Sequence, residues 1–312
     1  MSSNIAMELN IFKHRRLLRL WLSAMTIAGI GLTTQSTMAE TVMEKVARTG
    51  ILNAGTSKDA FPFAYADNQE QLVGYSVDML KLIQQQLERE LGRKIKLRLV
   101  ALDPKDRIPQ LVNREVDIVC DASSFTWERD RKIDFSVSYG ITGTRLLVKQ
   151  NSYPEIEKSL ANKRIGVLPG TTNELAIKRA ETKANIVYLK DRNEGYTALE
   201  TGAIDAFADD GILLGSWLQK ANNAEDFNLI GYYSEEGIAC MIPENNSQLL
   251  NNVNYALVSF MQGFINQQNG SVTLFNRWFG DNGQVPLTQD LRALMLENMQ
   301  LILDFKEEIS LE

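Results

Sequence analysis

The sequence contains one histidine and two cysteines among its 312 residues. The histidine, His14, lies in a basic segment near the N-terminus that we expect to be removed from the mature protein. A mature chain without histidine excludes a histidine-based zinc site, a Ser-His-Asp triad and a Cys-His catalytic pair. We therefore expect no metal site and no cofactor.

The first thirty-nine residues are organised like a signal peptide. Basic residues as far as Arg19 precede an apolar run from Leu20 to about Leu32, and the small residues of "TTQSTMA" follow. We expect cleavage after Ala39. The alternative is an uncleaved anchor, although the apolar run is short for a membrane span. No cysteine follows this run, which argues against a lipid anchor, and no later segment is long and apolar enough to cross a bilayer.

The chain is acidic, with 33 Lys and Arg against 39 Asp and Glu, and loss of the basic leader would make it more so. An acidic surface disfavours nucleic acid and anionic membranes as partners. The two cysteines, Cys120 and Cys240, could form a disulfide in an oxidising compartment or remain as two thiols. Composition alone leaves both possibilities open.

Short apolar runs alternate with amphipathic helical stretches from Gly50 onward, which indicates an α/β protein. We expect strands at 50–57, 94–100, 115–120, 163–169, 185–189 and 203–209, and helices at 76–92, 106–114, 170–180, 193–202 and 286–309. The scheme occurs twice, so two βα lobes are expected. Lobe 1 would comprise residues 40–145 and 240–312, and lobe 2 residues 146–239. The last helix should pack back on lobe 1.

Polar residues follow the predicted strands at their carboxyl ends, where open α/β sheets bind ligands. These residues are Ser57 and Lys58; Ser123, Ser124, Thr126 and Arg129; Gly170, Thr171 and Thr172; and Asp209 and Asp210. The default site is therefore a cleft between the two lobes.

These residue types suit an α-amino acid. Arg129 can grip a carboxylate with two hydrogen bonds, and the N-terminus of the helix after Gly170 favours an anionic group. Asp210 has the opposite sign and suits an ammonium group. Taken singly, Arg129 and Asp210 could each be ordinary surface residues, and Thr171 could be a plain helix cap.

The motifs "GYSVDML", "SSFTWERDRKIDFS", "GTRLLV", "GVLPGTTNE" and "RWFG", in this order, resemble the family 3 solute-binding proteins of polar amino acid ABC transporters. The segments "FPFAY", "DRIPQL" and "GTRLLVK" look most like the glutamate/aspartate-binding branch. The resemblance covers nearly all of the expected mature chain.

The resemblance implies a type II periplasmic binding fold, with two βα lobes joined by a two-strand hinge that close over the ligand. Arg129 and Ser124 would bind the α-carboxylate. Groups near Ala122 and Ser124, together with Asp210, would bind the α-ammonium, and lobe 2 would contribute Thr171 and Thr172. The resemblance also implies a Cys120–Cys240 disulfide.

In the acidic branch, basic residues hold the distal carboxylate of the ligand, and the matching positions here are Arg107 and Arg192. One departure is that Ser57 replaces an arginine after the first strand, with Lys58 next to it. Counting the arginines against Asp210 gives a net positive site, in which a neutral ligand would leave one arginine without an anionic partner. On this reasoning glutamate or aspartate is the expected ligand. Glutamine or another polar amino acid is the alternative.

The resemblance further implies a periplasmic receptor that is not an enzyme, acts as a monomer and delivers its ligand to ABC permease subunits. The rival from another class is a cyclohexadienyl dehydratase-like enzyme on the same fold. Such an enzyme needs a general acid, and only Asp209, Asp210 or Lys58 could serve, if its pKa were strongly shifted.

Overall fold

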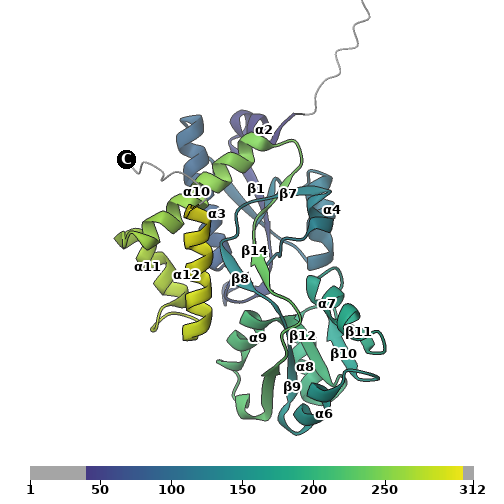
Figure 1. The fold of residues 1–312 in the computed structure, drawn as a ribbon. Helices are drawn as coiled ribbons and strands as arrows, with labels where there is room; N and C mark the ends of the chain where they lie inside the picture. The colour runs from purple at the N-terminus through teal and green to yellow at the C-terminus, as the bar shows by residue number, and fades with distance from the viewer. Residues whose placement is uncertain (1–39, 305–312) are drawn as a thin grey trace, which may run out of the picture. The chain divides into compact units, whose positions relative to one another are not determined.

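The computed structural model describes residues 40–304, whose helices and strands run from Val42 to Asp304 (Figure 1). The predicted signal peptide and the last residues of the predicted C-terminal helix, 305–309, lie outside the described residues. Within residues 40–304, no helix combines the length and apolar character needed to cross a membrane.

The first five-stranded sheet has the order β5-β1-β6-β15-β7. Its strands are β1 (Ile51–Thr56), β5 (Lys96–Ala101), β6 (Ile118–Val119), β7 (Ile133–Phe135) and β15 (Met241–Pro243). β1 pairs in parallel with β5 and β6, whereas β15 runs antiparallel to β6 and β7. The helices in this part of the chain are α2 (Val42–Thr49), α3 (Tyr75–Leu91), α4 (Arg107–Val112), α5 (Trp127–Asp130), α10 (Ser247–Ile265), α11 (Asn269–Phe279) and α12 (Gln289–Asp304), with a short 3-10 turn η1 (Pro104–Asp106).

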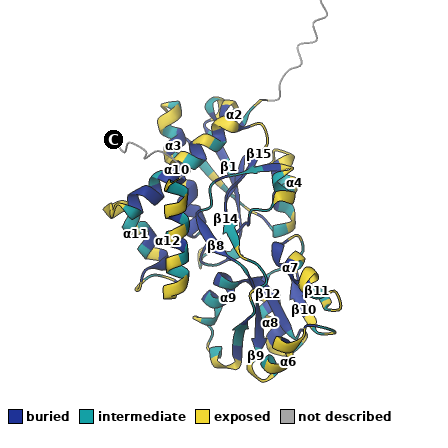
Figure 2. Cartoon of the chain, in the orientation of Figure 1, coloured by how far each residue is buried: buried dark blue, intermediate teal, exposed yellow. Residues whose placement is uncertain are grey.

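The second five-stranded sheet has the order β11-β10-β12-β9-β13. Its strands are β9 (Thr144–Lys149), β10 (Arg164–Val167), β11 (Asn185–Tyr188), β12 (Ala206–Asp210) and β13 (Phe227–Ile230). The accompanying helices are α6 (Tyr153–Lys158), α7 (Thr172–Ala180), α8 (Arg192–Thr201) and α9 (Gly211–Leu218), with 3-10 turns η2 (Gln150–Ser152) and η3 (Ala224–Asp226). Each sheet has its own buried apolar core (Figure 2).

Two strands connect the sheets. β8 (Gly140–Thr142) pairs antiparallel with β14 (Glu236–Ile238), and the chain passes through this ribbon once in each direction. A small antiparallel sheet of β2 (Asp59–Ala60), β3 (Ala64–Ala66) and β4 (Leu72–Val73) follows β1. The architecture is the predicted α/β fold with two sheet-containing lobes. The predicted lobe boundaries, after residues 145 and 239, stay a prediction.

α3 shows how the sequence sets a local boundary. Gly74 precedes the helix with φ 141°, and a Cβ there would lie 2.1 Å from the carbonyl oxygen of Phe63, so only glycine fits. At the other end, Gly92 takes the left-handed conformation and caps the helix. The prediction of a helix over 76–92 is confirmed with a shift of one residue.

The C-terminal helix α12 packs on the first lobe, as predicted. Met295 and Met299 are 1% exposed and belong to the same apolar core as α3 and α10. The side chain of Asn298 also interacts with Ser138, just before β8, because the Ser138 hydroxyl lies 2.9 Å from the Asn298 Oδ1.

Several predicted strand boundaries differ from the observed ones, and one of them bears on the site. The expected strand at 203–209 forms as β12 at Ala206–Asp210, so Asp209 and Asp210 lie within the strand and not after it. The antiparallel partner β9 extends the pairing, because Asp209 lies opposite Arg145 and Asp210 opposite Thr144. Both aspartates are buried as a result.

Cys120 and Cys240 form the implied disulfide, with Cα atoms 4.4 Å apart. The bond closes a sequence separation of 120 residues. Replacing both cysteines with alanine should lower the free energy of unfolding by about 4–5 kcal/mol. The reason is that the unfolded chain gains conformational entropy when a loop of this length is no longer closed by the disulfide. Urea denaturation of the double variant and of the reduced wild type measures this loss. Equal midpoints for oxidised and reduced protein would contradict the expectation.

Candidate functional site

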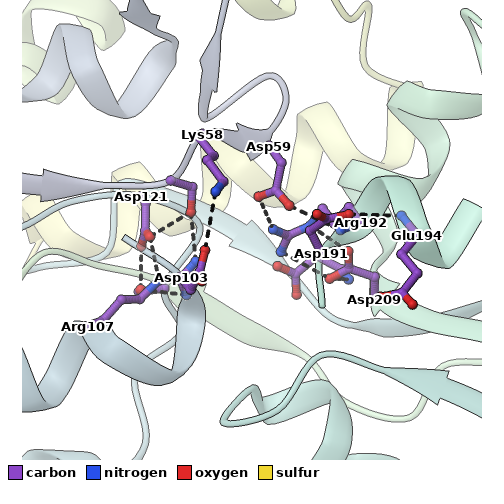
Figure 3. Close-up of polar contacts among 12 residues, drawn as sticks. Lys58, Asp59, Asp103, Arg107, Asp121, Asp191, Arg192, Glu194 and Asp209 are labelled. Atoms are coloured by element: carbon purple, nitrogen blue, oxygen red, sulfur yellow. Dashed lines mark hydrogen bonds and ion pairs between the residues drawn. The ribbon is translucent and has the colours of Figure 1, made fainter. Parts of the chain in front are cut away.

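A buried cluster around Arg107 lies beyond the ends of β1 and β6 (Figure 3). Arg107 Nε lies 2.7 Å from Asp121 Oδ2. Its Nη2 donates to Ser57 Oγ at 2.8 Å and its Nη1 to Ser123 Oγ at 3.3 Å. The hydroxyls of Ser57 and Ser123 in turn donate to the Asp121 carboxylate. All three guanidinium nitrogens therefore face oxygen atoms of the chain itself. We call these four residues the Arg107 cluster.

A second cluster forms around Arg192, the first residue of α8 (Figure 3). Arg192 Nε donates to Asp209 Oδ2 at 2.6 Å and Nη2 to Asp209 Oδ1 at 3.3 Å. Nη1 donates to Asp59 Oδ1 at 2.9 Å, and the Arg192 backbone N–H donates to the other oxygen of Asp59. Asp209 also accepts from the amide of Asn173. These four residues are the Arg192 cluster. It joins β2, next to the first sheet, to β12 of the second.

Charge pairing governs the protonation of the Arg192 cluster. Burial alone would lower the pKa of Arg192, but Asp209 and Asp59 outweigh it, and the pKa is raised. Burial would raise the pKa of Asp59, but Arg192 outweighs it, and the pKa is lowered. Arg107 also acts on Asp59, so the two clusters lie within electrostatic reach of each other. Arg192 and Asp59 are therefore an ion pair at neutral pH.

Arg129 is bound differently from the other two arginines. It lies in α5, whose N-cap Thr126 accepts the Arg129 backbone N–H. Its Nη1 donates to the carbonyl of Ser124 at 2.8 Å and its Nη2 to the carbonyl of Gly170 at 3.0 Å. Within residues 40–304, no carboxylate forms an ion pair with Arg129. Burial lowers the pKa of Arg129, and Arg107 lowers it further.

Asp210 is a buried carboxyl group with an unused acceptor. It is 2% exposed, and its Oδ1 has no hydrogen-bond partner within residues 40–304. Burial raises the pKa of Asp210 well above its ordinary value, and the neighbouring Asp209 and Glu236 raise it further. Asp210 in turn raises the pKa of Arg129, so the two side chains lie within electrostatic reach. A carboxyl group and a guanidinium, each without an ionic partner within residues 40–304, therefore lie within electrostatic reach of each other.

The remaining predicted residues surround these groups. Thr171 caps α7 by accepting the Glu174 N–H, and it donates to the Leu168 carbonyl. Thr172 begins the helix and is 8% exposed. Ser124 and Ala122 are also buried, on the segment between β6 and α5. This segment is close to the start of α7, because Arg129 bonds the Gly170 carbonyl.

Lys58 is less suited to binding a ligand than the sequence suggested, because its side chain is exposed. Its side chain is 49% exposed, and its Nζ lies 3.7 Å from Asp103 Oδ1. Figure 3 shows this pair beside the Arg107 cluster. An exposed ion pair at this distance contributes little to stability.

Sequence reasoning identified Asp209 but missed Asp121 and Asp59, the other two acids that bind the buried arginines. Asp121 follows Cys120 directly, and Asp59 follows Lys58, so both stand beside positions that were singled out. Their position after predicted strands was a usable signal. The pairing of Asp59 with Arg192 spans 133 residues of sequence and could not be read from local pattern. Within residues 40–304, no three His, Cys, Asp or Glu side chains gather in a way that could hold a metal ion.

These pairings correct the charge argument for an acidic ligand. When three arginines are counted against Asp210 alone, a neutral ligand leaves one arginine without an anionic partner. The structure pairs Arg107 with Asp121, and Arg192 with Asp59 and Asp209. A neutral ligand therefore leaves neither Arg107 nor Arg192 without an anionic partner, and the charge count no longer favours an acidic one.

The chain is similar to several binding proteins of known name. It is 27% identical to the glutamate/aspartate import solute-binding protein of Escherichia coli, over 83% of this chain and 88% of that protein. It is 28% identical to the L-glutamate/L-aspartate-binding protein of Pseudomonas aeruginosa, over 81% and 87%. It is 30% identical to the glutamine-binding protein of Geobacillus stearothermophilus, over 58% and 69%.

Solved structures show the same fold. An ancestral amino acid-binding protein described as a precursor of cyclohexadienyl dehydratase matches with a TM-score of 0.64 at 27% identity, covering 76% of this chain and 99% of that chain. An ancestral arginine-binding protein bound to arginine matches with a TM-score of 0.63 at 25% identity, over 74% and 99%. A family model matches residues 52–281, which is most of the chain. The chain belongs to the bacterial extracellular solute-binding proteins, family 3.

Proposed function

We propose that this protein is the substrate-binding receptor of an ABC importer and that it captures an α-amino acid between its two lobes. One observation carries the proposal: Arg129 has no carboxylate partner in the described chain, and the nearby buried Asp210 has an oxygen without a partner. An α-amino acid supplies a carboxylate to the first and an ammonium to the second. Burying both charges with partners removes the cost of leaving them unpaired.

The two groups come from different lobes, which suggests how binding leads to closure. Arg129 belongs to α5, beside the first sheet, and Asp210 ends β12 in the second. A ligand that contacts both favours the arrangement in which the lobes are together. The β8 and β14 ribbon would be the hinge, because it is where the chain passes between the sheets. The closed form is then the one that a permease recognises.

Relatives support an amino acid ligand but differ in the one they name. The Escherichia coli and Pseudomonas aeruginosa proteins are named for glutamate and aspartate, and the Geobacillus stearothermophilus protein for glutamine. Glutamate or aspartate was the ligand expected from the sequence. Its distal carboxylate would need Arg107 or Arg192, and both already bind carboxylates of the chain. The backbone of the amino acid is therefore better supported than an acidic side chain.

The proposal includes location and partners. We place the protein in the periplasm, with residues 1–39 removed on export, and give it permease subunits of an ABC importer as partners. The family description, bacterial extracellular solute-binding proteins, supports export. It functions as a monomer and not as an enzyme in this proposal.

A thermal-shift screen with the twenty amino acids tests the function. A binding constant near 1 μM corresponds to about 8 kcal/mol of binding free energy. At millimolar ligand, mass action then raises the melting temperature by several degrees. At least one amino acid should produce such a shift, and sugars or dipeptides at the same concentration should not. A flat response to all twenty would contradict the proposal.

The pKa of Asp210 predicts a pH dependence of binding. Because that pKa is raised in the free protein, Asp210 carries a proton at a pH where an ordinary aspartate is ionised. A bound ammonium favours the carboxylate, so binding expels this proton. Affinity should therefore rise as the pH rises through the pKa of free Asp210 and level off above it. Calorimetry between about pH 5 and pH 8, in buffers of different ionisation enthalpy, measures affinity and proton release.

Asp210→Asn is the matched control. The amide cannot ionise, so the variant should bind weakly at every pH and release no proton. Since a raised pKa in the folded state makes the ionised form destabilising, the variant should also be more stable than wild type above that pKa and equal to it at low pH. Proton release equal to zero in the wild type would rule out the assigned role of Asp210.

The enzyme alternative has one observation in its favour. The ancestral binding protein described as a precursor of cyclohexadienyl dehydratase shares this fold. Asp210 meets the requirement for a general acid, because burial raises its pKa. Asp209 is engaged with Arg192 and Lys58 is half exposed, so neither is suited. Incubation with prephenate should leave the substrate unchanged, and formation of phenylpyruvate would establish the enzyme instead.

A further inference from the structure

We propose that Asp59 and Asp121 set the ligand class of this receptor: they neutralise Arg192 and Arg107 from within the chain, so that the site takes an α-amino acid with an uncharged polar side chain. This inference rests on the proposed function, and it goes further by naming the substrate class and the two residues that determine it.

The polar groups of the Arg107 cluster bind one another. Arg107 is 5% exposed and Asp121 is fully buried, with 2.7 Å between Nε and Oδ2. The serines that bond the guanidinium also bond the carboxylate. A ligand carboxylate would have to displace Asp121 or lie beside it. A carboxylate buried beside another is unfavourable, because like charges repel strongly where water is excluded.

The Arg192 cluster leads to the same result. Arg192 is 2% exposed, and each of its three side-chain nitrogens donates to a carboxylate oxygen. Asp59 is bound twice, by the side chain and by the backbone N–H. An anionic side chain therefore finds two carboxylates, Asp59 and Asp209, beside the one guanidinium at this position. The structure offers it no free cation there.

A cationic side chain fits no better. Asp59 and Asp121 are each already paired with a guanidinium, and Arg107 and Arg192 would repel a further positive charge. Three further acids act on the site: Asp209 is bound to Arg192, Asp210 would take the α-ammonium, and Glu236 of β14 accepts from the Ser234 hydroxyl. A side chain that bears an amide or a hydroxyl can bond to the hydroxyls and the remaining guanidinium N–H groups without adding charge.

The test compares four ligands by calorimetry: L-glutamine, L-asparagine, L-glutamate and L-aspartate. Wild type should bind glutamine or asparagine. It should bind the corresponding acid, glutamate or aspartate, on the order of 100-fold more weakly, because the ligand carboxylate would lie beside a carboxylate of the chain. Asp121→Asn keeps the shape of the side chain but removes its charge, which leaves Arg107 without an anionic partner. This variant should shift the acid-to-amide affinity ratio toward the acid by about tenfold or more.

Asp106→Asn is the control. It makes the same change of charge next to Arg107 in sequence, and no ion pair joins Asp106 to that arginine. The affinity ratio should stay at the wild-type value. Asp59→Asn is the second test variant, because it removes the carboxylate that accepts from Nη1 of Arg192. If neither variant folds, the acid-to-amide affinity ratio of the wild type is sufficient to test the inference.

The outcomes separate this inference from the function on which it rests. Wild type that binds glutamate or aspartate as tightly as the amides would overturn the inference and leave an amino acid receptor standing. Folded Asp121→Asn and Asp59→Asn proteins with the wild-type ratio would also overturn it. Binding of none of the twenty amino acids would overturn both.

Discussion

Replacing Arg129 with alanine should abolish measurable amino acid binding and leave the fold intact. The guanidinium donates only to the backbone carbonyls of Ser124 and Gly170, so its loss leaves no buried carboxylate without a partner. A ligand carboxylate would receive two charged hydrogen bonds from it, each contributing about 1.5–3 kcal/mol. Their loss corresponds to a drop in affinity of roughly 100-fold to 10,000-fold. Calorimetry with the amino acid identified by the thermal-shift screen measures the change.

Arg131→Ala is the matched control for this variant. Arg131 lies two positions along the chain, is exposed, and follows α5 as its C-cap. The control removes the same charge from the same lobe and should bind as wild type does. Urea denaturation shows whether both variants are folded. A folded Arg129→Ala protein with wild-type affinity would show that the guanidinium does not hold the ligand.

Replacing Arg192 with methionine should destabilise the protein severely, by about 3–5 kcal/mol. The change leaves the buried Asp209 and the half-buried Asp59 without their shared cation, and a buried charge without a partner is costly. The free energy of unfolding from urea titration measures the effect. This prediction treats Arg192 first as a structural cation between the lobes, whereas the sequence suggested a ligand contact.

Removing the unpaired charge of Asp209 from the Arg192→Met variant should restore part of the stability. Arg192→Met combined with Asp209→Asn leaves one fewer unpaired carboxylate, and the two changes together should cost less than the sum of each alone. Arg164→Met is the comparison, because Arg164 pairs with Asp205 in an exposed position, with 46% of the Arg164 side chain accessible. An exposed pair contributes at most about 1 kcal/mol. Equal losses for Arg192→Met and Arg164→Met would contradict a structural role for Arg192.

The α/β fold could be predicted because its signals are local. The helix at 76–92 carries an apolar stripe and a terminal glycine, and both are readable in a short window. The polar groups after strands were found by the same reasoning, since strand ends meet at one edge of a sheet. Arg129 and Asp210 were identified in this way, as was the segment that begins α7.

Charge pairing could not be predicted because it depends on long-range geometry. Arg192 and Asp59 are brought together only when the second lobe meets the small sheet after β1. Asp121 was not predicted, although it directly follows a predicted strand and supplies the carboxylate for Arg107. Counting arginines without their acids gave a net positive site, and the structure removes that excess.

The most direct test of the account is a calorimetric comparison of the preferred amino acid with two derivatives of it. The amide form lacks the α-carboxylate that we assign to Arg129, and the N-acetyl form lacks the α-ammonium that we assign to Asp210. The account predicts micromolar or tighter binding of the free amino acid and loss of measurable binding for both derivatives. Binding of either derivative with the affinity of the free amino acid would contradict it.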